Sequence, residues 1–245
     1  MPATAATESW TTWLFLLAAF ALAPFVLTMV TSFVKLVVVA SLIRTAIGTP
    51  QIPPAIVING LALVLTIHIM WPVGEAVGVN YARLAAERRE QNRLQRPEAD
   101  PNAADLTSGE AVELALQAAS EPLSKFLRKN ADPRNVELFQ QLRTRLAAGN
   151  ATPGDVNAPA PESPLAVWTT LVPAFVLTEL TEAFQIGFLI FLPFLIIDLA
   201  VSNVLLALGA QTLQPTVVSL PLKLLLFVMV DGWSLLVKSV VLGYT

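Results

Sequence analysis

The chain has 245 residues, of which 55% are hydrophobic and 13% charged, and its formal net charge is −3. Soluble domains carry roughly 25% charged residues, so this composition indicates a membrane protein, and the negative charge gives no electrostatic case for a nucleic-acid partner. The lack of cysteine excludes disulfides and thiolate metal sites, and the only histidine, His68, excludes a multi-histidine metal site within one chain. We expect no cofactor, and we interpret His68 as a core residue of a helix.

The first apolar segment opens the N-terminal part of the chain. Residues 9–34 carry no charge, which meets the length of about 18 apolar residues that a membrane span requires. Lys35 and Arg44 then interrupt the apolar run, and the glycine and prolines within 48–54 predict the end of a helix. A cleaved signal peptide is the alternative for the extreme N-terminus. Residues 1–8 contain no Lys or Arg, which favours retention.

A second apolar arm follows over residues 55–71. Pro72 and Gly74 predict its end, because proline removes a backbone donor and glycine weakens a helix. Residues 1–74 therefore predict an apolar helical hairpin.

The middle part, residues 75–163, is polar, with acidic and basic side chains interleaved. Thr107 and Glu110 fit a capping box at the start of an amphipathic helix. Asp132 and Pro133 fit the N-cap and first position of a second helix, which we expect to end near residues 149–150. We predict a small helical domain flanked by linkers.

Charged residues within the apolar third part, residues 164–245, are the most informative feature of the sequence. A charge at the centre of a spanning helix costs about 2.5–3.5 kcal/mol, so the set would cost on the order of 10 kcal/mol if it faced lipid. We therefore expect the charges of both hairpins to be buried against protein or water and to act in assembly. The predicted assembly charges are Lys35, Arg44, Glu179, Glu182, Asp198, Lys223 and Asp231.

Local patterns add detail to this second hairpin. Glu179 and Glu182 are three residues apart and share a helix face. Gly187 and Pro193 suggest a broken helix. We interpret Trp233 as a core residue and Tyr244 as an interfacial anchor. The complete chain is thus predicted to be all-α, with membrane-associated hairpins around a polar helical domain.

Enzyme signatures are absent from the sequence. It contains no Gly-x-Gly-Asp motif of an aspartyl intramembrane protease and no Gly-x-Ser-Gly motif of a rhomboid protease. It also lacks a phosphate-binding loop and a His-Glu-x-x-His helix. We expect no catalytic residues. A secondary transporter or ion channel that uses the intramembrane carboxylates remains an alternative.

Several long motifs carry a family resemblance, in order along both hairpins. The first hairpin contains MVTSFVK at 29–35, LIRTAIGTP at 42–50, PP at 53–54 and NGLAL at 59–63. The second contains EL at 179–180, AFQIGF at 183–188, PFLIIDL at 193–199, LPLKL at 220–224 and DGW at 231–233. The sequence resembles the FliP/SctR family of type III secretion export-apparatus proteins over residues 28–71 and 171–244. The middle domain matches only in position and size.

The resemblance implies a pore-forming subunit of the bacterial inner membrane, within the basal body of a flagellum or injectisome, that conducts unfolded substrate proteins. It implies several copies, about five, assembled with FliQ/SctS-type and FliR/SctT-type subunits into a funnel. It also implies contacts with export-gate and basal-body proteins, hairpins lifted largely out of the lipid plane, and a periplasmic middle domain. The segment 201–203 and the retained N-terminus resemble the injectisome branch more than the flagellar one.

One segment departs from the family pattern. Many relatives carry consecutive methionines after the Leu-Gly pair, where they form a flexible gasket around the pore. This chain has Ala210, Gln211 and Thr212 between Gly209 and Leu213. We predict that these five residues form a loop, and the resemblance implies that the loop surrounds the channel.

Overall fold

Helices make up all the regular structure that the computed structural model describes, which covers residues 17, 21–22, 24–49, 53–95, 108–150, 164–210 and 212–244. No strand occurs within these ranges, so the prediction of an all-α fold is confirmed. The predictions about signal cleavage and about Thr107 fall outside the described residues. The helices are α2 (Phe33–Ile47), α3 (Ala55–Gln95), α4 (Ser108–Asn130), α5 (Pro133–Asn150), α6 (Pro164–Ala207), α7 (Pro215–Met229) and α8 (Gly232–Leu242).

The first apolar segment contains a break before α2. Residues 24–29 are helical, and a bend at 30–32 separates them from α2. At the other end, α2 stops at Gly48, whose φ of 89° lies in the left-handed region that glycine adopts without strain. The predicted helix end is therefore confirmed.

The second apolar arm is longer than we expected. Helix α3 continues through Pro72 and reaches Gln95, so the expected end at Pro72 and Gly74 is wrong. A single proline removes only one backbone hydrogen bond, and the rest of this long helix keeps its own. The hairpin arm and the first polar residues of the middle part thus form one helix.

Both amphipathic helices of the middle part are present, and α5 begins and ends near its predicted positions. The N–H of Arg134 donates to Oδ1 of Asp132 over 2.8 Å, which caps α5 as expected. The side-chain hydrogen bond from Arg134 lowers the pKa of Asp132 below its usual value. Helices α4 and α5 therefore meet at a tight, capped turn.

Helix α6 crosses the whole molecule without a break. It spans 44 residues and passes through Pro173 and Pro193, so the predicted break near Gly187 and Pro193 is wrong. Gly187 instead permits close packing, because a Cβ there would lie 2.3 Å from Cδ1 of Leu42. The bend of the second hairpin lies between α7 and α8, whose axes differ by 59°.

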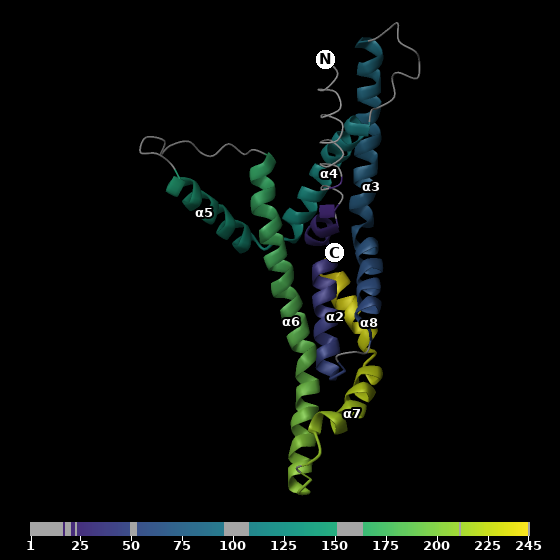
Figure 1. Cartoon of the computed structure of the whole chain (residues 1–245), viewed down its shortest axis with the longest axis vertical. Helices are drawn as coiled ribbons and strands as arrows, with labels where there is room; N and C mark the ends of the chain where they lie inside the picture. The colour runs from purple at the N-terminus through teal and green to yellow at the C-terminus, as the bar shows by residue number, and fades with distance from the viewer. Residues whose placement is uncertain are drawn as a thin grey trace, which may run out of the picture.

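Figure 1 shows α2 at the centre of the molecule, between the two long helices α3 and α6, with α7 and α8 alongside it. Helix α4 packs beside α3 and α6, while α5 diverges from α6. The buried core joins α2 to the other elements through residues that include Val39, Ile43, Phe175, Ala183 and Leu236. The α6–α7 loop lies at the opposite end of the molecule from the C-terminal ends of α3 and α5.

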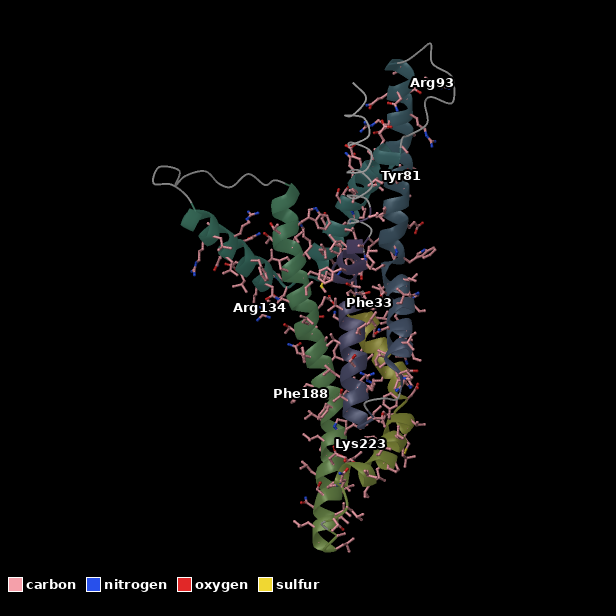
Figure 2. The ribbon with its side chains drawn as sticks, viewed as in Figure 1. Phe33, Tyr81, Arg93, Arg134, Phe188 and Lys223 are labelled. Carbon is pink, nitrogen blue, oxygen red and sulfur yellow. The ribbon has the colours of Figure 1, made fainter. Side chains whose placement is uncertain are left out.

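Both long helices expose apolar surface. Segments Ala55–Leu94 and Trp168–Ala207 are each long and apolar enough to cross a membrane, and α7 with α8 could form a third, bent span. Phe188 extends from the outer side of α6, away from α2 (Figure 2), and is 63% exposed. Continuous apolar surface of this size marks contact with lipid or with other proteins.

Candidate functional site

The first charged cluster joins α2 to α6 through Lys35. The Lys35 side chain is almost fully buried, and its Nζ lies 3.2 Å from Oε2 of Glu179 and 2.7 Å from Oε2 of Glu182. The two carboxylates reach one ammonium because they share a face of α6, as predicted. An unpaired lysine at this depth would be very costly, so the cluster fixes α2 against α6.

The same cluster extends to the residues after α8. Tyr244 donates its hydroxyl hydrogen bond to Oε2 of Glu179, and Nζ of Lys35 lies 4.2 Å from the centre of its ring. The ring stacks on Phe126 of α4 at 6.0 Å, and Nζ of Lys129 donates to the Tyr244 carbonyl over 3.1 Å. Tyr244 is thus buried, and its interpretation as an interfacial anchor is wrong. The cluster connects both hairpins with the middle helices.

A polar cleft of about 350 Å³ opens beside this cluster. Its lining includes Lys35, Lys129, Arg134, Glu179 and Glu182. The other carboxylate oxygen of Glu179, Oε1, is buried without a hydrogen-bond partner among the described residues. The cleft has the volume and the polar lining that an ordered water molecule requires.

The second charged cluster joins α7 to α6 and α2 through Lys223. Its Nζ donates to Oδ2 of Asp198 over 2.7 Å and to the carbonyl of Ala46 over 3.1 Å. Ser219 donates to the other oxygen of Asp198. In Figure 2 Lys223 lies where α7 passes close to the lower parts of α2 and α6. The lysine therefore neutralises a carboxylate and also satisfies a carbonyl at the end of α2.

Two predicted assembly charges lie outside these clusters. Arg44 is in the last turn of α2, and its Nε atom is buried without a partner among the described residues. Asp231 lies between α7 and α8 with an exposed side chain, and it forms no ion pair within the described part of the chain.

The predicted loop lies between α6 and α7. Gly209 has a φ of 71°, which ends α6 in the left-handed region, and Leu213 is 53% exposed before α7 begins at Pro215. Ala210 is half-buried, Thr212 is exposed, and Gln211 falls outside the described residues. The described part of this segment has no helical residue, which fits the predicted loop.

Sequence reasoning missed some members of these clusters. Ser219 and Lys223 are four residues apart on α7, so helical spacing could have linked both to Asp198. No local pattern could have placed Tyr244 beside Glu179, which is 65 positions away. His68 is exposed on α3, so the interpretation as a core histidine is wrong. Trp233 packs edge-on against Phe227 at 5.4 Å but is 42% exposed, so its interpretation as a core residue is wrong.

Comparison with known proteins decides the family. The model of the FliP family matches residues 16–240, nearly the whole chain. The chain belongs to the FliP family. Among its FliP-family relatives, the hypersensitivity response secretion protein HrcR of Ralstonia nicotianae is 39% identical, over 92% of this chain and 93% of the relative. The Yop proteins translocation protein R of Yersinia pestis is 39% identical over 91% of each chain. The flagellar biosynthetic protein FliP of Bacillus subtilis is 37% identical over 94% of this chain and 90% of the relative.

These relatives are named for secretion, translocation and flagellar biosynthesis, and none of the three names describes an enzyme. The match includes both hairpins and the middle helices, so it covers both lysines, their carboxylate partners and the α6–α7 loop. The resemblance seen in the sequence motifs is confirmed.

Proposed function

We propose that this FliP-family chain is a pore-forming core subunit of a type III secretion export apparatus, which conducts unfolded substrate proteins across the bacterial inner membrane. The observation that carries the proposal is the pair of lysine clusters. Lys35 and Lys223 each bind carboxylates of α6 and hold the charges of two apolar hairpins inside one unit. A subunit built this way can assemble with other subunits around a pore without exposing these charges to lipid.

The exposed apolar faces of the long helices are available for contacts with other subunits. Residues such as Trp71 on α3 and Phe188 on α6 are more than half exposed in the single chain. We infer that copies of this chain and FliQ/SctS-type and FliR/SctT-type subunits cover part of this surface, and that lipid covers the rest. The subunit lies in the inner membrane within the basal body, with helices α4 and α5 on the periplasmic side.

The paired carboxylates favour this function over a secondary transporter. Glu179, Glu182 and Asp198 each lie within 3.2 Å of a lysine Nζ atom. Each of these carboxylates is bound to a lysine of another helix in the same chain, so it already serves to hold two helices together. Their geometry suits assembly without catalytic turnover.

Co-purification tests the proposal. The chain would be extracted in mild detergent together with its two candidate partner subunits, and the native mass of the complex would be measured. We expect several copies of this chain in one complex with both partners. A stable, monodisperse monomer from cells that contain both partners would refute the proposed assembly.

Topology offers a separate test. The chain has no native cysteine, so a single introduced cysteine reports its own location. Ser120→Cys on α4 should react in intact cells with a maleimide that passes the outer membrane and not the inner one. Labelling that appears only after the inner membrane is opened would place α4 on the cytoplasmic side.

We place the chain in the injectisome branch, on the basis of the segment 201–203. Deletion of its gene should abolish secretion through an injectisome and leave swimming motility intact. Loss of flagella with normal injectisome secretion would assign it to the flagellar branch.

A further inference from the structure

Two opposite charges of the hairpins stand apart from the lysine clusters. Lys35 and Lys223 have carboxylate partners on α6. Arg44 on α2 and Asp231 at the α7–α8 corner have no ion-pair partner within the described part of the chain. Each requires a partner of the opposite sign if it is covered by protein in the assembled state.

Arg44 lies half-buried in the last turn of α2. Its Nε atom is buried and makes no hydrogen bond to a described residue. The nearby carbonyl of Ala46 already accepts from Lys223, and the carbonyl of Thr45 accepts from the N–H of Gly48. A guanidinium that is partly desolvated and unpaired is suited to a planar carboxylate, which it can bind through two parallel hydrogen bonds.

Asp231 is held in an unusual backbone conformation. It is the only non-glycine residue with positive φ in the described part of the chain, at 50°. It occupies the N-cap of α8, yet its side chain makes no capping hydrogen bond. An aspartate at an N-cap ordinarily bonds a backbone N–H of the first turn, so this carboxylate is directed elsewhere and remains exposed.

The residue after Asp231 keeps the corner in place. A Cβ on Gly232 would lie 2.2 Å from the ring of Phe227, so α8 turns close against α7 at this position. The ring of Trp233 packs edge-on against the same phenylalanine. The exposed carboxylate is thus displayed on a rigid bend rather than on a free loop.

The helix ends next to these two residues can be compared along the long axis of the molecule. Figure 1 shows that α2 ends near the level of the corner between α7 and α8 along the long axis. Copies related by rotation about an axis parallel to the long axis keep each group at its height. In such an assembly the end of α2 in one copy and the α7–α8 corner of the next stay at matching levels.

We propose that Arg44 of one copy forms an ion pair with Asp231 of a neighbouring copy. The proposal rests on the assembly from several copies proposed above, and it names the contact that sets how adjacent copies are aligned. The pair uses the half-buried guanidinium of Arg44, whose Nε has no partner among the described residues, and the exposed carboxylate of Asp231 at a left-handed backbone position.

Charge reversal is the first test. Arg44→Glu and Asp231→Arg should each lower the yield of the oligomer at least about tenfold, since close charge pairs across interfaces couple by more than 1.4 kcal/mol. The double variant Arg44→Glu with Asp231→Arg should restore most of the yield, because the pair is re-formed with its signs exchanged. Arg44→Lys keeps the charge and should have the smallest effect.

Lys238 on α8 provides the matched control. It is exposed and has no ion-pair partner within the described residues, so it is the competing partner for Asp231 in the same hairpin. Lys238→Glu should leave the yield unchanged. A loss equal to that of Asp231→Arg, or a double reversal that restores nothing, would overturn the proposal.

Cross-linking determines which chains are joined at these two positions. Arg44→Cys and Asp231→Cys would be placed in two co-expressed copies with different tags, and a short bismaleimide would be added. We expect a covalent dimer that carries both tags. A cross-link found only in a chain that carries both cysteines would show a contact within one copy.

Two further outcomes would also contradict the proposal. A cross-link from position 44 to a different subunit would assign Arg44 to that subunit. Co-purified anionic lipid that is lost with Arg44→Gln would assign Arg44 to a lipid phosphate. In both cases a normal native mass of the unmodified complex would leave the proposed function standing.

Discussion

The side-chain ammonium Nζ of Lys35 in α2 lies 2.7 Å from Oε2 of Glu182, a residue 147 positions further along the chain. The same ammonium lies 3.2 Å from Glu179 and 4.2 Å from the centre of the Tyr244 ring. One side chain therefore holds the first hairpin, the longest helix and the segment after α8 together. Its removal should affect the whole unit and not only one helix.

Substitution of Lys35 tests this role. Lys35→Met should destabilise the subunit by about 3–5 kcal/mol, because Glu179 would remain buried without its counter-charge. The double variant Lys35→Met with Glu179→Gln should be more stable than Lys35→Met alone. Thermal unfolding of the purified complex measures both.

Arg145→Met on the exposed side of α5 is the control and should change little. If Lys35→Met unfolded at the same temperature as the unmodified protein, the cluster would not hold the hairpins together.

Asp198 tests the second cluster and the competing transporter function together. Asp198→Ala leaves the Lys223 ammonium buried without a carboxylate, so complex yield and secretion should fall together. Both would be measured on the same cultures. Normal assembly combined with loss of proton-driven uptake of a small solute would favour a transporter instead.

Gly187 tests the close contact between α2 and α6. Gly187→Ala should destabilise the subunit by about 1–3 kcal/mol, because its methyl group would overlap the Leu42 side chain. Gly187→Ala with Leu42→Ala should recover part of that loss by making room. Unfolding of the subunit in detergent, followed by circular dichroism, gives the measurement.

Gly60 supplies the matched control in α3, since a Cβ there would meet nothing within 4 Å. Gly60→Ala should be neutral or stabilising, as alanine favours a helix over glycine by up to about 1 kcal/mol. Equal effects at both glycines would contradict close packing at Gly187.

Much of this architecture follows from sequence patterns that act locally. The sequence correctly predicted the end of α2 at Gly48 and the start of α5 at Pro133. Glycine favours the end of a helix and proline its first position, and both effects act within a few residues. In the long helices, the prolines led us to predict helix ends or breaks that the structure does not have. Pro72 and Pro193 lie inside continuous helices, each at the loss of a single backbone hydrogen bond.

The charged clusters were only partly predictable. Because a buried charge is costly, we could expect that Lys35 and Lys223 have partners, but the sequence does not identify those partners. The shared helix face identified Glu179 with Glu182 as one group. Tyr244 and the Ala46 carbonyl join the clusters through contacts between distant segments, which periodicity cannot report.

The α6–α7 loop yields a prediction about sealing. Replacement of Ala210, Gln211 and Thr212 with methionine should lower the ion conductance of the isolated complex and still permit substrate export. Methionine is unbranched and adaptable, so a ring of methionines closes a pore more tightly than small or polar residues do. Single-channel recording in a planar bilayer measures the conductance. Unchanged conductance would mean that the loop does not line the path.

Cross-linking to a stalled substrate tests the central claim most directly. A secreted protein fused to a domain that cannot unfold would be trapped during export, with a photoreactive residue at Thr212 or Leu213 of the loop. We predict cross-links from these positions to the trapped segment and none from Ile56, an exposed residue on α3. Secretion that proceeds while neither loop position contacts the trapped substrate would contradict a pore-forming role for this chain.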